Sequence, residues 1–393
     1  MANIHGTYDP KFQGVFEKFR QFIESGQEVG ASLTVKIDGE DAINIWGGYA
    51  SPDHTRPWNE DTIVNVFSST KTLSALAVLL LINDGQLSAY DKVSKYWPEF
   101  AANGKQDIEV RHLLAHTSGI AVFEDDTTPE DLCNTGLIVS RLEKQAPRWE
   151  PGTASGYHSW TYGYLLGEVV RRRTGLSLKE FISQKVAVPL GADIQIGAHE
   201  KDWDRIAQLI LPPPFNPDDL PKSDPDSLTV KMIYPIPDEA FLHSAKWRNA
   251  EIGSGNAHTN SQALAQVWSG ALTISDDSKR LLSKETIDLI FKEQSYGVDL
   301  CIGLPVRVGI GMGLRGNGDA LIDAWVPKGN VCFWGGWGGS MVINDLDHRI
   351  TIAYAMNKLE SGSTGNASVK AYVAEIYKAL GVPVGTGEAV GHS

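Results

Sequence analysis

The sequence predicts an α/β (α+β) fold in which an antiparallel sheet flanked by helices is built from both ends of the chain, with an all-helical domain inserted between them. Strand-like alternation of apolar residues occurs over residues 33–45 and returns from residue 306, whereas the middle of the chain shows helical periodicity and long loops. We therefore expect an α/β domain made of residues 1–85 and 265–393 and a helical domain made of residues 86–264.

The N-terminal part predicts a helix followed by a hairpin. Apolar residues between Phe12 and Ile23 recur at helical spacing, and the pattern stops at Gly26. Alternating apolar residues at 33–37 and 43–45 then flank the turn dipeptide Asp38-Gly39. The simplest arrangement is this helix packed on an antiparallel sheet.

The middle of the chain predicts helices and one long loop. The apolar run 73–82 predicts a buried helix, and residues 110–119 predict a helix end with a turn behind it. Residues 164–171 and 178–182 predict two further helices separated by Thr174-Gly175. Residues 211–226 contain six prolines, which predicts a surface loop of the kind that forms lids or pocket walls.

Strand patterns return near the C-terminus. We expect strands at 306–313, 331–337, 340–343 and 349–356, and a closing helix at 368–380. These strands and the N-terminal hairpin would share one sheet.

Composition argues against several classes of partner. The chain carries 35 basic and 48 acidic residues, a net charge of −13, which disfavours nucleic acid or an anionic membrane as a partner. Its three cysteines are far apart and show neither a disulfide framework nor metal-ligand spacing, so we expect no cofactor, no metal and a reducing compartment. The first residues lack a secretory signal pattern, and the run 73–82 is too short to span a bilayer. We therefore expect a cytoplasmic protein.

The first chemical motif is Ser68-x-x-Lys71, which lies where an extended segment meets the apolar run 73–82. At this spacing both side chains lie on one helical face, so the Lys71 amine can reach the Ser68 hydroxyl. A lysine in apolar surroundings can be neutral enough to activate a serine, and the free N–H groups of the first turn can stabilise negative charge beside it. The alternative is a serine N-cap beside a solvated lysine.

The second motif is Tyr157, in a loop that enters a helix. Its phenol could act as a general base or proton shuttle if a nearby cation stabilised the phenolate, or it could be a buried tyrosine with a satisfied hydroxyl. We interpret His116 and His158 as structural or pocket-lining residues, because no second ligand lies at metal-binding spacing.

The third motif is the glycine-dense segment 333–340. Several glycines in a strand suggest that a ligand or another backbone approaches closely, and the N–H groups here could form one arm of an oxyanion hole. A tight bulged hairpin is the alternative. The glycines at 309–313 are followed by no helix and do not fit a dinucleotide-binding pattern.

Taken in order, these motifs resemble those of the serine β-lactamase-like superfamily. Ser68-x-x-Lys71, Tyr157 after Pro151-Gly152-Thr153, and Trp334-Gly335-Gly336 on a late strand are similar to the motifs of class C β-lactamases and D-alanyl-D-alanine carboxypeptidases. The chain resembles above all the family VIII carboxylesterases and the fungal lovastatin-type acyltransferases. The resemblance covers most of the chain, since segments 113–119 and 164–175 also look typical.

The resemblance implies the roles of the motif residues. Ser68 would be the nucleophile, Lys71 and Tyr157 the coupled base, and the backbone N–H groups of Ser68 and Trp337 the oxyanion hole. Two departures matter: Tyr157-His158-Ser159 replaces Tyr-x-Asn, and Trp334-Gly335-Gly336 replaces Lys-Thr-Gly. The lost lysine would hold a β-lactam or peptide carboxylate, so an indole there favours a neutral ester.

We therefore expect a serine hydrolase of carboxylic esters that works through an acyl-enzyme. Its substrate would be a small-molecule ester or thioester. The residues expected at the substrate are Trp160, Trp334, Trp337, Gly335, Gly336 and His158, together with the proline-rich loop. Two alternatives remain open. One is an acyltransferase that moves an acyl group from a thioester or ester donor, such as an acyl carrier protein, to an alcohol or amine. The other is a non-catalytic binding protein on the same fold. β-Lactamase activity is expected only as a side reaction.

Overall fold

The computed structural model describes residues 3–213, 224, 226–362 and 364–385. One sheet has nine strands in the order β1-β3-β2-β12-β11-β10-β9-β8-β7, and a second has three in the order β4-β6-β5. The strands of the large sheet are β1 (Ile4–Tyr8), β2 (Gly30–Ile37), β3 (Glu40–Gly48), β7 (Ser295–Val298), β8 (Pro305–Val308), β9 (Gly313–Leu314), β10 (Val331–Gly335), β11 (Met341–Asp345) and β12 (Ile350–Met356). Those of the small sheet are β4 (Val64–Asn65), β5 (Ile194–Ile196) and β6 (Ala257–Thr259).

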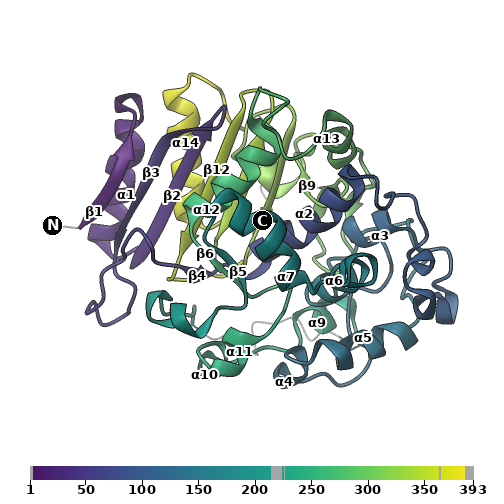
Figure 1. Cartoon of the computed structure of the whole chain (residues 1–393). Coiled ribbons are helices and arrows are strands. Elements are labelled where there is room, and N and C mark those ends of the chain that lie inside the picture. The colour runs from purple at the N-terminus through teal and green to yellow at the C-terminus, as the bar shows by residue number, and fades with distance from the viewer. Residues whose placement is uncertain (1–2, 214–223, 225, 363, 386–393) are drawn as a thin grey trace.

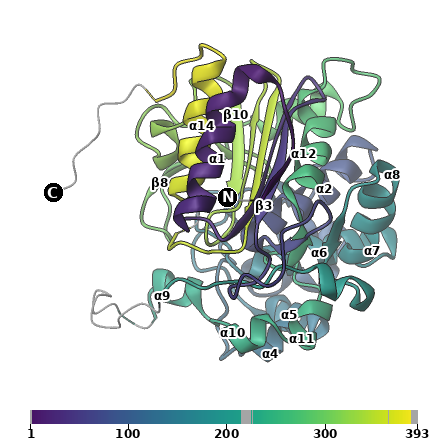
Figure 2. The same ribbon diagram turned by 90° about the vertical axis from the view of Figure 1, so that its left-hand side faces the viewer.

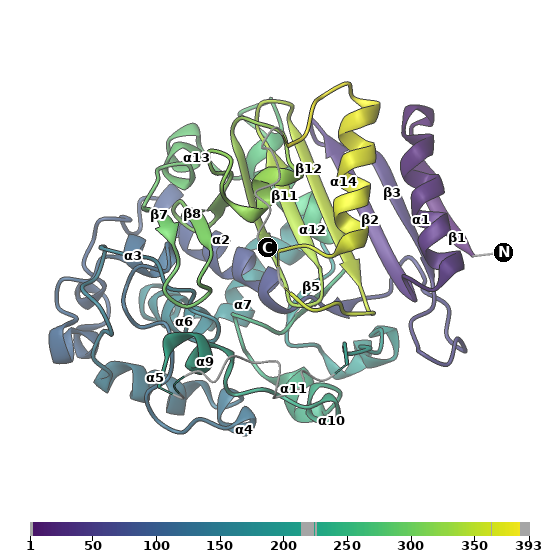
Figure 3. The ribbon, with the colours of Figure 1, turned by 180° about the vertical axis from the view of Figure 1, so that it is seen from behind.

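Helices cover both faces of the large sheet and fill the region beside it. They are α1 (Gln13–Ser25), α2 (Thr70–Asn83), α3 (Val110–Leu114), α4 (Pro129–Leu132), α5 (Thr135–Lys144), α6 (Thr161–Thr174), α7 (Leu178–Ile182), α8 (Val188–Leu190), α9 (Leu228–Ile233), α10 (Glu239–Leu242), α11 (Ala245–Asn249), α12 (Ser261–Trp268), α13 (Lys284–Ile290) and α14 (Ala367–Ala379). Helices α1 and α14 lie side by side on one face (Figures 2 and 3), and α12 packs on β2 and β12 from the other (Figure 1).

The predicted fold class is confirmed, because the two chain ends meet in one antiparallel sheet. Strand β2 pairs with β12 from Ala31 opposite Met356 to Ile37 opposite Ile350. The hairpin β2–β3 turns at Asp38 and Gly39, both at positive φ, as the Asp-Gly dipeptide predicts.

The predicted helices are also confirmed. Helix α1 ends at Gly26, whose φ of 74° closes the helix in the left-handed conformation, and Gly175 ends α6 in the same way at φ 78°. Helix α2 is buried on nearly all sides, as its uninterrupted apolar sequence predicts.

Two strand predictions need correction. Residues 306–313 are not one strand: β8 ends at Val308 and β9 begins at Gly313, because a turn between them is closed by a hydrogen bond from Gly309 N–H to Met312 O (2.9 Å). Strand β10 ends at Gly335 and not at residue 337. Strands β1 and β7 and the pairing of the small sheet were not predicted, although the segment before Ser68 was expected to be extended. Strand β1 lies at a sheet edge and is mostly exposed, so it carries no core-facing pattern.

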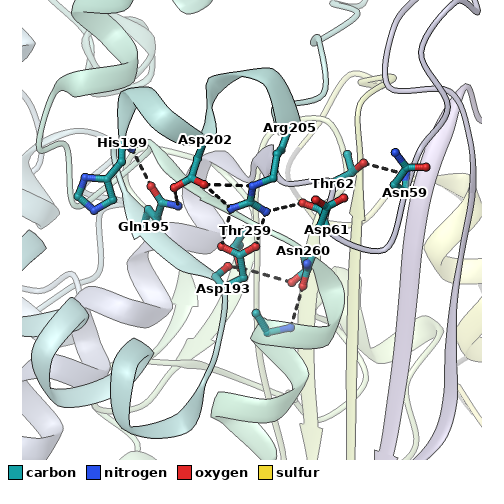
Figure 4. Close-up of polar contacts among 11 residues, drawn as sticks. Asn59, Asp61, Thr62, Asp193, Gln195, His199, Asp202, Arg205, Thr259 and Asn260 are labelled. Atoms are coloured by element: carbon teal, nitrogen blue, oxygen red, sulfur yellow. Dashed lines mark hydrogen bonds and ion pairs between the residues drawn. The ribbon is translucent and has the colours of Figure 1, made fainter.

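A network of polar contacts around Arg205 holds the small sheet together (Figure 4). The Arg205 guanidinium contacts Asp193 (2.6 Å) and Asp202 (3.0 Å) and donates to the Asp61 carbonyl (2.5 Å), while Thr259 donates to the Asp193 carbonyl (2.8 Å). These contacts join the ends of β5 and β6 to the segment that leads into β4. These contacts therefore fix the start of β4, which leads into the turn that carries Ser68.

The predicted boundary between residues 264 and 265 lies inside α12, which packs on the large sheet. We propose that the second boundary of the helical domain lies before Ser261. Most of the predicted proline-rich loop, residues 214–223 and 225, lies outside the described residues. None of the helices in the described part of the chain has the length and apolar character required to cross a membrane.

Candidate active site

Ser68 lies in a strained turn between β4 and α2. A 3₁₀ turn, Phe67–Ser69, precedes the first residue of α2. Phe67 has φ 44°, a conformation that bulky L-residues rarely adopt and that costs free energy. The turn is held by the Phe67 ring, which packs edge-on against Trp337 (centroids 5.1 Å apart), and by Ser340 Oγ, which donates to Val66 O (2.8 Å). The surrounding contacts thus fix Ser68 at the head of α2.

Lys71 lies one turn along α2 and is 1% exposed. Its Nζ lies 3.1 Å from Ser68 Oγ, 2.7 Å from the Ser159 carbonyl oxygen and 2.8 Å from the Ser254 carbonyl oxygen. Burial lowers the pKa of Lys71 well below its ordinary value. A neutral amine can donate its two N–H groups to the two carbonyls, which leaves its lone pair for the hydroxyl proton of Ser68.

Tyr157 meets the same serine from the loop before α6. Its hydroxyl donates to Ser68 Oγ at 2.7 Å, and Lys71 Nζ lies 4.9 Å from the centroid of its ring. Burial raises the pKa of Tyr157, so the group at Ser68 is a phenol and not a phenolate. This favours Lys71 as the group that can accept a proton and Tyr157 as one that can pass a proton on.

The glycine-rich segment closes on Ser68 from the side of the large sheet. A Cβ atom on Gly336 would lie 2.2 Å from Val66 O and 3.2 Å from Ser68 N, so only glycine fits beside this turn. The next residue is Trp337, at the start of the turn that leads to β11. The close approach anticipated from the glycine density is therefore present, and the residue is Gly336.

An apolar pocket of about 270 Å³ opens beside Ser68. Of the described residues that line it, none is charged. Two of the predicted substrate residues, Trp160 and Trp337, are in its wall, with Phe67 and a set of apolar residues near α9 and α10: Met232, Ile233, Ile236, Pro237 and Leu242.

The other predicted substrate residues lie elsewhere. Trp334 and Gly335 line a separate cavity, whose wall also includes Tyr157. His158 is fully buried: its Nε2 lies 2.6 Å from Ser118 Oγ and its Nδ1 lies 2.6 Å from the Gly156 carbonyl. Because both ring nitrogens are occupied inside the protein, the prediction that His158 contacts the substrate is wrong, and its interpretation as a structural histidine is favoured.

Several residues at the site were not predicted. The carbonyls of Ser159 and Ser254 accept hydrogen bonds from Lys71. They could not be predicted, because every residue has a backbone carbonyl and no residue type identifies these two. Asp299 accepts hydrogen bonds at Oδ1 from the N–H groups of Tyr157 (3.0 Å), Cys301 (2.9 Å) and Ile302 (3.0 Å), and so anchors the Tyr157 loop. No motif around Asp299 signals this role.

Comparison with known proteins identifies relatives over most of the chain. A family model described as Beta-lactamase matches residues 15–374. The esterase/beta-lactamase LipL of Mycobacterium tuberculosis is 26% identical over 369 residues, which cover 91% of this chain and 84% of LipL. A solved family VIII carboxylesterase is 31% identical with a TM-score of 0.86, over 96% of this chain and all of that one. A penicillin-binding protein homologue from Caulobacter crescentus is 30% identical with a TM-score of 0.87, at the same coverage.

Proposed function

The chain belongs to the Beta-lactamase family, and from this premise and the geometry around Ser68 we propose that it is a serine carboxylesterase that hydrolyses carboxylic esters through an acyl-enzyme. Family membership and the esterase relatives make it an enzyme of the serine β-lactamase-like type. The observation that carries the proposal is that one hydroxyl oxygen, Ser68 Oγ, contacts both the Lys71 amine (3.1 Å) and the Tyr157 phenol (2.7 Å).

In the first half of the reaction Ser68 Oγ attacks the ester carbonyl while Lys71 takes its proton. The oxygen of the carbonyl becomes an oxyanion, which the backbone N–H groups of Ser68 and Trp337 stabilise. As the C–O bond of the ester breaks, a proton passes from the Lys71 ammonium by way of the Tyr157 hydroxyl to the departing alkoxide. The alcohol leaves, and the acyl group stays on Ser68.

In the second half a water molecule attacks the acyl carbonyl. The same groups act in reverse: a proton leaves the water for Lys71, the bond to Ser68 Oγ breaks, and Ser68 regains a proton as the carboxylic acid departs. The apolar pocket beside Ser68 suits the acyl chain, and its lack of a charged lining residue in the described structure supports an uncharged acyl group.

The decisive experiment compares the wild type with Ser68→Ala on 4-nitrophenyl esters of increasing acyl length. We expect the variant to lose roughly 10⁴-fold or more of kcat, as is usual when a nucleophile is removed. Intact-mass spectra should show one phosphonate adduct on the wild type and on the exposed-serine control Ser278→Ala, and none on Ser68→Ala. Adducts or turnover that persist in Ser68→Ala would remove Ser68 as the nucleophile.

Acyl transfer is the second candidate, because two separate cavities meet at Tyr157. An acyl donor, either a small ester or thioester or an acyl carrier protein, could load Ser68 from one side. An alcohol or amine in the other cavity could then replace water. Product analysis with and without an added alcohol separates the two reactions: a transferase gives mainly the new ester, and a hydrolase gives mainly the acid.

Two further hypotheses, a non-catalytic binding protein and a β-lactamase, can each be tested with one reagent. A non-catalytic binding protein would form no phosphonate adduct at all. A β-lactamase would turn over nitrocefin rapidly, which we do not expect because an indole stands where lactamases carry the lysine of Lys-Thr-Gly.

A further inference from the structure

Tyr157 lines a second cavity besides the acyl pocket. It has a volume of about 80 Å³ and is lined by four ring side chains, His116, Tyr157, Phe333 and Trp334. The His116 and Trp334 rings are stacked 5.0 Å apart at 14°, and the Tyr157 and Trp334 centroids lie 5.9 Å apart. One water needs about 10–15 Å³ of such space, so the cavity has room for a small alkylammonium group.

One buried carboxylate faces this aromatic lining. Asp299 is 2% exposed and lines the cavity. Its Oδ1 accepts three backbone N–H groups, whereas Oδ2 has no hydrogen-bond donor and the carboxylate no ion-pair partner among the described residues. Asp299 therefore presents to the cavity a negative charge that three N–H groups stabilise but that no cation of the described residues pairs.

The two basic groups in the cavity wall do not cancel this charge. The Arg307 guanidinium is engaged by Glu293 (Nε to Oε2, 2.8 Å) and by the Arg315 carbonyl (3.1 Å). His116 Nδ1 accepts the N–H of His158 (3.1 Å), and burial, with the nearby His158 and Lys71, holds the pKa of His116 well below its ordinary value. His116 is thus a neutral ring, stacked on both Trp334 and Tyr162, and it adds no positive charge to the cavity wall.

We propose that this cavity binds a small organic cation, the alkylammonium head of the alcohol portion of the substrate, so that the preferred substrates are esters of amino alcohols. Ring faces attract a cation electrostatically, and a carboxylate beside them adds to that attraction. The proposal rests on the proposed esterase function. It also uses the position of Tyr157, whose ring lines this cavity while its hydroxyl contacts Ser68 at 2.7 Å. Under the proposal, the alcohol that receives its proton from the Tyr157 hydroxyl extends its cationic head into this cavity.

The binding test does not depend on turnover. Ser68→Ala protein is titrated with tetramethylammonium chloride, with sodium chloride as the ionic control, and tryptophan fluorescence is recorded because Trp334 lines the cavity. We expect saturable quenching, and at least about tenfold weaker binding when Asp299→Asn is added, in line with the strength of desolvated cation–π and charge contacts. Asn can still accept the three N–H groups at Oδ1. The control Asp288→Asn removes the same charge from an exposed position on α13 and should bind like the parent.

The kinetic test uses two esters of the same shape, butyrylcholine and 3,3-dimethylbutyl butyrate, which differ only in that a positively charged nitrogen of the first is a neutral carbon in the second. We expect the wild type to prefer the cationic ester by about tenfold or more in kcat/KM, and Asp299→Asn to lose that preference. Thermal melts identify a variant that does not fold. If Asp299→Asn does not fold, the ester preference of the wild type and the tetramethylammonium titration of Ser68→Ala still test the cation site.

The outcomes separate the two proposals. Neutral-ester turnover without tetramethylammonium binding or cation preference overturns the cation site and leaves the esterase proposal standing. Saturable binding that depends on Asp299, without turnover of either ester, supports the cation site and overturns the esterase proposal. A preference that survives in Asp299→Asn removes Asp299 as its cause.

Discussion

At the residue scale, the state of Lys71 decides whether Ser68 can react. The buried amine contacts two carbonyl oxygens and one hydroxyl, and no carboxylate of the described residues forms an ion pair with it. Burial therefore lowers its pKa without an opposing negative charge. Because the base must be neutral, activity is lost as the pH falls through this lowered pKa. We expect log kcat/KM to reach its plateau well below the ordinary lysine pKa of about 10.4. Activity that climbs steadily to pH 10 would contradict this.

We expect the activity lost in Tyr157→Phe to depend on the leaving group of the ester. Tyr157→Phe keeps the ring but removes the hydroxyl that contacts Ser68 Oγ, so kcat for alkyl esters should fall by about 10²–10⁴-fold. A 4-nitrophenyl ester needs little protonation of its leaving group, so its acylation rate should fall less. The control is Tyr162→Phe, since the Tyr162 hydroxyl donates to the Leu114 carbonyl (3.2 Å) and not to Ser68. Equal losses for both ester types in Tyr157→Phe would exclude proton delivery by Tyr157.

At the scale of elements, the contact between α6 and the segment before β6 holds the Lys71 site. A Cβ atom on Gly163 would lie 2.3 Å from both Gly253 C and Ser254 N, and the Ser254 carbonyl is one of the two that hold Lys71. Gly163→Ala should therefore destabilise the protein by about 1–3 kcal/mol and lower kcat as well. On the same helix Gly167→Ala meets Leu178 at an ordinary 3.5 Å, so it should be neutral or stabilising by up to about 1 kcal/mol. Urea unfolding and ester hydrolysis of both variants test this, and equal behaviour of the two would contradict it.

An element could be predicted from the sequence when the residues that define it are close together in the chain. Helix α1 and the β2–β3 hairpin carry their own periodicity and turn residues, so both were predicted. The small sheet was missed because two- and three-residue strands are defined by partners far along the chain, as when Val64 pairs with Thr259. The same division holds at the site. Ser68 and Lys71 lie one turn apart at the start of α2, whereas the Asp299 carboxylate accepts the Tyr157 N–H across 142 positions of the chain.

At the scale of the whole molecule, the large sheet joins the two ends of the chain, and a buried acid lies at that junction. Glu28, just before β2, is 2% exposed and accepts a hydrogen bond from the hydroxyl of Tyr354 on β12. Asn366, the N-cap of α14, donates to the same hydroxyl (3.2 Å). Glu28 Oε2 has no hydrogen-bond partner within the described structure. Burial raises the pKa of Glu28 to about 7, although the hydroxyls of Tyr354 and Ser368 oppose this.

Because of this carboxyl we expect the protein to lose stability as the pH rises from 4.5 to about 7. Below pH 4.5, its ordinary value, Glu28 is protonated in both the folded and the unfolded chain. Between 4.5 and about 7 the unfolded chain releases the proton while the folded chain keeps it, so the free energy of unfolding falls as the pH rises. Above that range the full cost is present, about 3 kcal/mol at 1.36 kcal/mol per pKa unit. Glu28→Gln stays neutral and can still accept from Tyr354. Urea unfolding from pH 5 to 9 should therefore show Glu28→Gln gaining stability over the wild type as the pH rises. A constant difference across that range would mean that Glu28 ionises in the folded protein as it does in water.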